Sequence, residues 1–165
     1  MRFYRSAVGR GVFSLMEITV VVVVLGVVGT IVGPRMSRGA SPSPFVGEQV
    51  LVGNLRMMRE AIASYAADHG GRIPTGSAEQ VVAQLTQYTD VQGGVSAKKR
   101  GRYQLGPYLG QIPPLPVGIH RGAATVGLVG SPGEAGWVYD ASSGRVRANA
   151  GEHESDAIGR PYAAY

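Results

Sequence analysis

The N-terminal part of the sequence holds a long apolar run with a single acidic residue at its start. Residues Ile18 to Gly33 carry no charge, and Glu17 directly precedes them. The stretch from Phe13 to Gly33 has 21 residues. As a helix it would be about 31 Å long, which matches the ~30 Å hydrocarbon core of a bilayer. A secretory signal has a shorter apolar region, of roughly 7–15 residues. The pattern therefore predicts a membrane-spanning helix over 13–34.

A second apolar pattern, with helical spacing, follows a stretch rich in proline and serine. Ser43 and Pro44 suit the N-cap and the first position of a helix, and Gly70-Gly71 suits its end. Between them the apolar positions recur at spacings of 4, 3, 4 and 3 residues, which places them on one face. They are Leu51, Leu55, Met58, Ile62 and Tyr65. We therefore expect a helix over 44–68 whose apolar face packs against a sheet.

The segment after this helix predicts a second, shorter one. Ser77 and Gln80 have the spacing of a capping box, and the apolar residues that follow continue as a short amphipathic helix. These residues are Val81, Val82, Leu85 and Tyr88. A turn is expected over Asp90–Gly94, and a basic loop over 98–102 comes after it.

Two or three short strands are predicted in the C-terminal part, over 125–129, 136–139 and 145–147, with a turn over 140–144 between the last two. Trp137 and Tyr139 lie on one face of a strand, and we interpret them as core residues rather than as a platform for stacking a ligand. The expected fold class is α+β, with the amphipathic helix packed on a small antiparallel sheet and preceded by an N-terminal transmembrane helix. The polar stretch 151–165 is expected to form a loosely held tail.

The formal net charge of +5 is concentrated next to the apolar run. Residues 1–38 contribute +4 and all the others together contribute +1, so nucleic acid is not expected as a partner. Arg2, Arg5 and Arg10 precede the run and favour a cytoplasmic N-terminus, although Arg35 and Arg38 follow it. The basic loop over 98–102 is interpreted as solvated, with contact to a phosphate backbone or a membrane surface as the alternative.

Several motifs resemble the type IV pilins and the pseudopilins of type II secretion. The N-terminal motif runs from Phe13 to Glu17 and is followed by the apolar run and Pro34. Further along, Gly106-Pro107-Tyr108-Leu109 and Trp137-Val138-Tyr139-Asp140 look like the head of a G-type, or major, pseudopilin. The resemblance implies five parts: a prepilin leader at 1–12, a transmembrane and polymerisation helix at 13–34, a Pro/Ser linker at 35–44, a periplasmic head at 45–150 and the polar tail at 151–165.

The same resemblance implies how the chain is processed and where it resides. Prepilin peptidase would remove the leader, and the new amine of Phe13 would be methylated. The family has a glycine directly before this phenylalanine, whereas here Val12 stands between Gly11 and Phe13. Cleavage after Gly11 and cleavage after Val12 are thus both open, and the positions of Glu17 and Pro34 favour the second. The mature protein would be a single-pass inner-membrane protein with a cytoplasmic N-terminus and a periplasmic head.

Glu17 is the candidate residue for subunit assembly. A carboxylate at membrane depth costs several kcal/mol unless it is paired, and the amino terminus of a neighbouring subunit would supply the cation. The alternative is an unpaired acid at the membrane edge. The implied partners are other copies in a homo-oligomeric filament, minor pseudopilins, prepilin peptidase and the inner-membrane secretion platform.

The resemblance implies a structural subunit of a periplasmic pseudopilus that serves type II protein secretion. The rivals are a type IV pilus or DNA-uptake minor pilin and a membrane-tethered binding module that does not polymerise. An enzyme is not expected, because the sequence has no nucleophile elbow and no phosphate-binding glycine loop.

Neither a cofactor nor a disulfide is expected, and the chain has no cysteine. Some G-type heads bind calcium, for which Asp140 and Ser142 are weak candidate ligands, but a plain hairpin turn is the preferred interpretation. His69, His120 and His153 lack the spacing of metal ligands and are expected at the surface.

Overall fold

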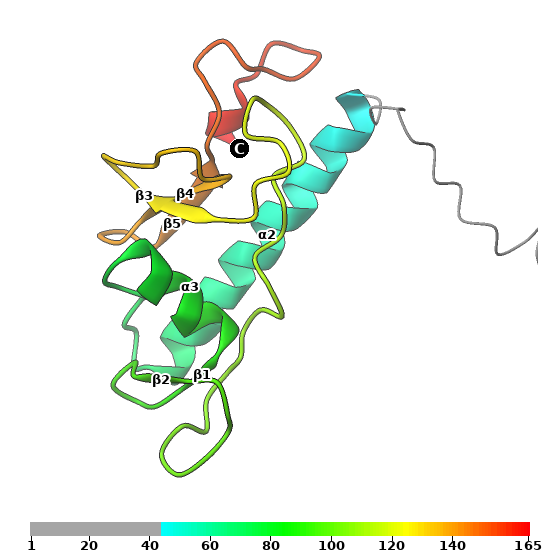
Figure 1. The fold of residues 1–165 in the computed structure, drawn as a ribbon. Helices are drawn as coiled ribbons and strands as arrows, with labels where there is room; N and C mark the ends of the chain where they lie inside the picture. The colour runs from blue at the N-terminus through cyan, green and yellow to red at the C-terminus, as the bar shows by residue number, and fades with distance from the viewer. Residues whose placement is uncertain (1–43) are drawn as a thin grey trace, which may run out of the picture. The chain divides into compact units, whose positions relative to one another are not determined.

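The computed structural model describes residues 44–165, and residues 41–165 form a unit of their own. The predicted leader, the membrane helix over 13–34 and nearly all of the linker lie outside the described residues. Within 44–165, no helix is both long enough and apolar enough to cross a bilayer. The described part is α+β, with a long helix packed on small sheets (Figure 1).

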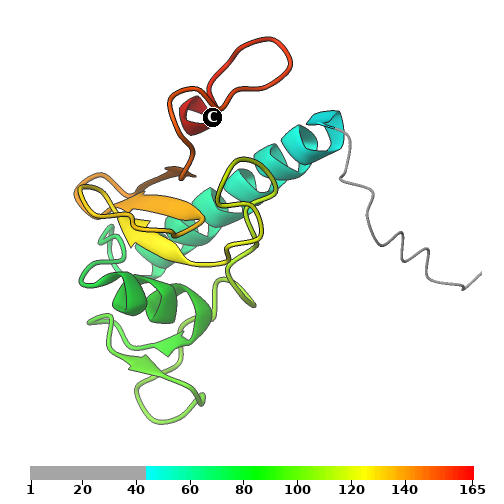
Figure 2. The same cartoon turned by 45° about the horizontal axis from the view of Figure 1, so that its top comes forward.

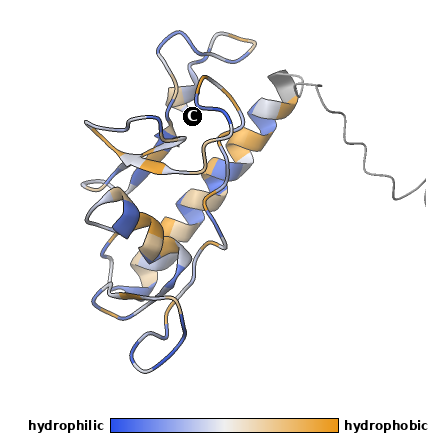
Figure 3. Ribbon diagram, viewed as in Figure 1, coloured by the Kyte–Doolittle hydropathy of each residue, from blue (hydrophilic) through white to orange (hydrophobic). Residues whose placement is uncertain are grey.

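Helix α2 runs from Pro44 to Asp68 and is the longest helix of the described residues. We call the part of the described structure over 44–150 the head. The predicted apolar stripe is confirmed, because all five of its residues are buried with exposed fractions between 0% and 6%. They are Leu51, Leu55, Met58, Ile62 and Tyr65. Apolar and polar residues alternate around the helix along its length (Figure 3). The helix ends where Gly70 adopts φ +65° and Gly71 φ +84°, conformations that residues with a side chain rarely adopt.

The predicted capping box is confirmed at the start of helix α3, Ala78–Thr86. The Ser77 hydroxyl accepts from the Gln80 N–H, and the Gln80 side chain accepts from the Ser77 N–H. Tyr88 was expected in this helix but begins strand β1, Tyr88–Thr89, which pairs antiparallel with β2, Val95–Ser96. The helix stops because Gln87 has an extended backbone. The predicted turn over 90–94 therefore connects two short strands.

Three predicted strands form the second sheet, in the order β3-β4-β5. Strand β3 is Val126–Leu128, β4 is Trp137–Asp140 and β5 is Arg145–Ala148. Strands β4 and β5 are antiparallel, with Tyr139 opposite Val146. Strands β3 and β4 are parallel, with Gly127 opposite Val138. The prediction of an antiparallel sheet is therefore wrong for this pair.

The short connection over 129–136 makes the parallel pair by reversing direction twice. Ser131 N–H donates to the Leu128 carbonyl at 3.1 Å, and Ala135 N–H donates to the Pro132 carbonyl at 3.2 Å. The eight residues that join β3 to β4 contain no helix and are fewer than the dozen or more of a usual parallel crossover. The loop lies directly against β3, where a Cβ on Gly127 would be 2.4 Å from the Pro132 carbonyl oxygen.

The core lies between α2, α3 and the three-stranded sheet (Figures 1 and 2). Trp137 and Tyr139 are 0% and 1% exposed, which confirms that they are core residues. Their polar atoms are satisfied by main-chain carbonyl groups, Trp137 Nε1 by Pro113 at 2.7 Å and the Tyr139 hydroxyl by Pro74 at 2.9 Å. A buried polar atom without a partner would be costly, so these two bonds fix how the loops pack on the sheet.

The polar stretch 151–165 is tied to the head, contrary to the expectation of a loosely held tail. Ala157 N–H donates to the Glu48 carboxylate of α2 at 3.1 Å, and the Tyr165 hydroxyl donates to Asp156 at 2.6 Å. The chain ends in a 3₁₀ turn, Tyr162–Ala164, labelled η1. Nearby carboxylates accept hydrogen bonds from the backbone N–H groups of this loop-rich stretch. The composition alone does not reveal these contacts.

Candidate functional site

The residues predicted to carry processing and assembly precede the described chain. Gly11, Val12, Phe13 and Glu17 all lie outside residues 44–165. The structure does describe an exposed apolar face of α2, a groove beside the C-terminal turn, the Asp140 turn, the aromatic cluster around His69 and the basic loop over 98–102.

An exposed apolar stripe runs along α2, on a face that points away from the buried one. Val46, Val50 and Met57 are 45–46% exposed, and together with Gly53 they follow the i, i+4, i+7, i+11 spacing of one helix face. The space around Gly53 is open, with no atom within 4 Å of where a Cβ would lie. This stripe begins at the N-terminal end of α2.

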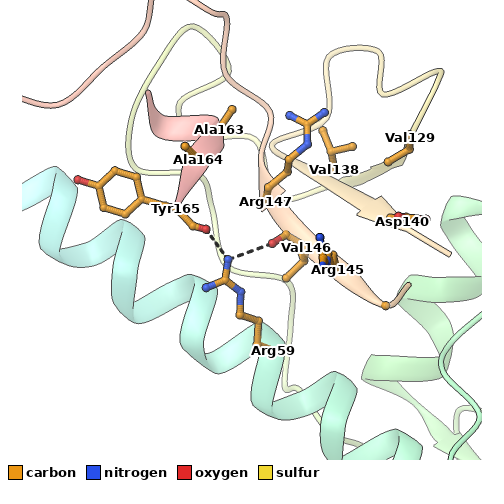
Figure 4. Close-up of a pocket in the computed structure, with 11 residues that line it drawn as sticks. Arg59, Val129, Val138, Asp140, Arg145, Val146, Arg147, Ala163, Ala164 and Tyr165 are labelled. Carbon is orange, nitrogen blue, oxygen red and sulfur yellow. Dashed lines mark hydrogen bonds between the residues drawn. The ribbon is translucent and has the colours of Figure 1, made fainter. Parts of the chain in front are cut away.

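A groove of about 550 Å³ lies between β5, α2 and the C-terminal turn (Figure 4). The Arg59 guanidinium donates to the carbonyl groups of Val146, at 3.3 Å, and Tyr165. Arg145 and Arg147 line the same groove and are exposed. Arg59 therefore holds the C-terminal turn against α2 and β5, and three arginines and the Asp140 carboxylate line the groove.

The two weak calcium candidates, Asp140 and Ser142, meet in the turn between β4 and β5. One Asp140 carboxylate oxygen accepts from the Ser142 N–H at 2.9 Å and the Ser142 hydroxyl at 2.6 Å, and the other accepts from the Ser143 hydroxyl at 2.7 Å. These bonds lower the pKa of Asp140 to about 2. Across the described residues, no three histidine or acidic side chains come together as a metal site. The Asp140 carboxylate therefore stabilises the turn between β4 and β5.

His69 is buried at the end of α2, so the prediction of a surface histidine is wrong for this residue. Its Nδ1 lies 2.7 Å from the Tyr65 carbonyl oxygen and its Nε2 lies 2.9 Å from that of Asp90. The ring also stacks on Tyr65, with centroids 3.7 Å apart, and meets Tyr108 edge-on. Burial raises the pKa of Tyr65, and that of Tyr108 to about 12. The cluster joins the end of α2 to the β1–β2 hairpin.

The basic loop over 98–102 is anchored through one of its arginines. Arg102 Nε forms an ion pair at 2.8 Å with the buried Asp90 carboxylate, which also accepts from the Gly94 N–H. Lys98, Lys99 and Arg100 are exposed and form no ion pair within residues 44–165. The sequence reveals the positive charge of this loop but not the buried Asp90 carboxylate that binds Arg102.

Comparison of the chain with protein-family models, with curated proteins and with solved structures finds no match. We therefore infer function from the motifs of the sequence and from the surfaces of the head.

Proposed function

We propose that the chain is a membrane-anchored structural subunit of a periplasmic pseudopilus that serves type II protein secretion. In this proposal the helix over 13–34 anchors the subunit in the inner membrane and later packs inside the filament. Glu17 pairs with the amino terminus of a neighbouring subunit, and the head faces the periplasm. The role is assembly, with no catalytic step in the subunit itself.

The observation that carries the proposal is the exposed stripe of α2. A helix that served only its own head would need one apolar face, and the five buried residues already provide it. A second stripe through Val46, Val50 and Met57 leaves apolar area in water that packing against other helices would cover. Gly53 within the stripe would let such helices approach closely.

Glu17→Gln tests the predicted pairing because it removes the charge and keeps nearly the same shape. The variant should insert into the membrane and fold like the wild type, but yield strongly reduced filament, since the neighbour's amine then lacks its partner in low dielectric. The measurement is the amount of sheared or cross-linked filament, relative to membrane-inserted protein, in cells that hold the cognate secretion machinery. Glu79→Gln, which removes an exposed carboxylate of the head, is the control. Unchanged filament in Glu17→Gln would refute the pairing.

A second pair of variants tests the stripe itself. Val50→Ser and Val52→Ser make the same change on α2 at residues that are 45% and 50% exposed. Val50 belongs to the stripe, whereas Val52 lies about 160° away around the helix at ~100° per residue. Val50→Ser should reduce filament and Val52→Ser should not, at equal head stability. Equal filament from the two variants would contradict a packing role for the stripe.

A further inference from the structure

Two arginines share the exposed face of β5 and line the groove of about 550 Å³ beside the C-terminal turn (Figure 4). The strand alternates exposed and buried residues, so Arg145 and Arg147 face away from the core while Val146 between them is 2% exposed. Residues two apart in a strand are separated by about 6.6 Å. Neither guanidinium forms an ion pair or a side-chain hydrogen bond within residues 44–165.

The carboxylate that lies opposite β5 in the sheet is already engaged in a turn. Asp140 is opposite Arg145 in the register, a position where opposite charges commonly interact. Its carboxylate instead accepts three hydrogen bonds within its own turn, and it forms no ion pair in the described part of the chain. Arg147 is opposite Val138, which has no polar side chain. Both guanidinium groups are therefore available to an acceptor from outside the chain.

The walls of the groove suit an extended chain. Residues 144–147 and 163–165 line it as two consecutive stretches, so we infer that the groove follows the direction of β5. The Arg59 bonds to main-chain carbonyl groups on both stretches hold the two sides together. Two alanines of η1 line one side, and Val129, which is 58% exposed, also contributes. Small apolar groups of a ligand could thus lie against the walls while its acidic groups reach the arginines.

The charge around the groove favours a short acidic segment over a long polyanion. Asp140 lines the groove itself, and Glu152 lines a neighbouring hollow together with Arg147. Residues 39–165 have a net charge of only +1. Nucleic-acid binding depends on many basic groups that neutralise successive phosphates, whereas this groove offers two unpaired arginines beside carboxylates.

We propose that the groove binds an extended segment of another protein with acidic side chains at alternate positions. Alternate side chains of an extended chain lie on one side, about 6.6 Å apart, which matches the separation along β5 of Arg145 and Arg147. Each guanidinium can donate two parallel hydrogen bonds to one carboxylate. The side chain between the two acidic residues points the other way, toward the wall that the alanines of η1 form.

The chain itself does not offer such a segment. Acidic residues alternate at only one place in the sequence, at Glu152, Glu154 and Asp156. The carboxylates of Glu154 and Asp156 each accept two hydrogen bonds from backbone N–H groups of the described structure. Because these groups are engaged in their own loops, the occupant is a different protein and not a second copy. The proposal is independent of the pseudopilus function, since one subunit forms the whole groove.

Peptide binding to the full-length chain in detergent micelles tests the spacing. The probe is a fluorescein-labelled alanine hexapeptide with two glutamates separated by one alanine, and fluorescence anisotropy measures its affinity. A second peptide has the same composition with the two glutamates adjacent. The first peptide should bind about fivefold more tightly, because only its carboxylates reach both arginines from one side. Equal affinities would overturn the proposal, and this comparison needs the wild-type chain alone.

A pair of double variants tests the residues. Arg145→Gln with Arg147→Gln should weaken binding of the first peptide about tenfold, through loss of both charged donors. Arg100→Gln with Arg121→Gln removes the same charge at two exposed arginines outside the groove, and should change the affinity less than ~twofold. Circular dichroism checks that all the variants fold. Equal losses from the two double variants would show attraction to net charge alone and would overturn the proposal.

Two further measurements identify other occupants. A labelled oligothymidylate should bind more weakly than the first peptide, and tighter binding that depends on Arg145 and Arg147 would assign the groove to nucleic acid and overturn the proposal. Filament yield of the Arg145→Gln, Arg147→Gln variant should equal that of the wild type. A reduced yield in this variant but not in the control would indicate that a second copy occupies the groove, and would also overturn the proposal. Loss of filament in every chain, wild type included, would count against the pseudopilus function and leave the peptide result to stand or fall by itself.

Discussion

The Tyr139 hydroxyl donates a 2.9 Å hydrogen bond to the main-chain carbonyl of Pro74, 65 residues away in the sequence. This bond ties the central strand of the sheet to the loop that follows α2, inside a core where Tyr139 is 1% exposed. Burial raises the pKa of Tyr139 to about 12, so the neutral, donating form persists well above neutral pH.

Tyr139→Phe should therefore destabilise the head by ~1 kcal/mol or more, because the Pro74 carbonyl is left without its partner. Tyr88→Phe removes a hydroxyl that makes no hydrogen bond within the described chain and should change stability by less than ~0.5 kcal/mol. Urea unfolding of the two variants beside the wild type measures the difference. Equal stabilities would show that the Tyr139 bond contributes nothing.

Residues 43–165 should fold without the N-terminal apolar run, because the buried face of α2 packs on the sheet of the same unit. A fragment from Ser43 onward is expected to be soluble, and Leu55→Ala within it should cost ~2–5 kcal/mol. Met57→Ala, on the exposed face of the same helix, should cost less than ~0.5 kcal/mol. Chemical denaturation followed by circular dichroism measures the free energy of unfolding of each variant. A loss below ~0.5 kcal/mol for Leu55→Ala would contradict the packing.

The helices of the head could be predicted from the sequence because their signals are local. The spacing of Leu51, Leu55 and Met58 reports a helix face directly, and Ser77 with Gln80 marks a helix start through two hydrogen bonds three residues apart. The sequence also indicated the three main strands, since β3 and β4 are short, mainly apolar segments, β5 alternates arginine with apolar residues, and turn residues bound all three.

Strand direction and the burial of His69 could not be predicted, because both depend on distant contacts. Two successive turns connect β3 to β4, which pair parallel, whereas an antiparallel sheet was expected. His69 is buried because the carbonyl oxygen of Asp90, 21 residues away, faces its ring. Neither contact produces a periodic pattern of apolar and polar residues in the sequence.

Two glycines should respond in opposite ways to alanine. Gly127→Ala places a Cβ 2.4 Å from the Pro132 carbonyl oxygen, so the loop over 129–136 must move and stability should fall by ~1–3 kcal/mol. Gly53→Ala adds a methyl group to open space on α2 and should raise stability by ~0.5–1 kcal/mol. Thermal unfolding of both variants tests the pair. The same variant Gly53→Ala should reduce filament if the stripe packs closely, and normal filament would exclude close packing there.

Asp140 should make the stability of the head depend on pH in the acid range. Its hydrogen bonds to Ser142 and Ser143 lower its pKa to about 2 from the ordinary 3.8. The ionised form therefore stabilises the folded state fully above pH ~4, and this contribution is lost as the pH falls through about 2. Asp140→Asn should be less stable than the wild type at neutral pH, and the difference should shrink between pH 4 and pH 2. Thermal melts at several pH values measure it, with Glu134→Gln as the control for loss of an exposed carboxylate. A difference that stays constant with pH would mean that the turn does not depend on the charge.

The mature chain should begin at Phe13 with a methylated amine. The reason is the register, since Glu17 lies four residues after Phe13 and Pro34 closes the apolar run, as in the pilin motif. Mass spectrometry of protein extracted from membranes, in cells with a prepilin peptidase, reads the N-terminus directly. Val12→Gly restores a glycine before Phe13 and should be cleaved at the same bond, at least as completely as the wild type. A mature chain beginning at Val12 would place cleavage after Gly11 and shift the register of Glu17 by one residue, and an intact Met1 in both chains would remove the processed-subunit interpretation.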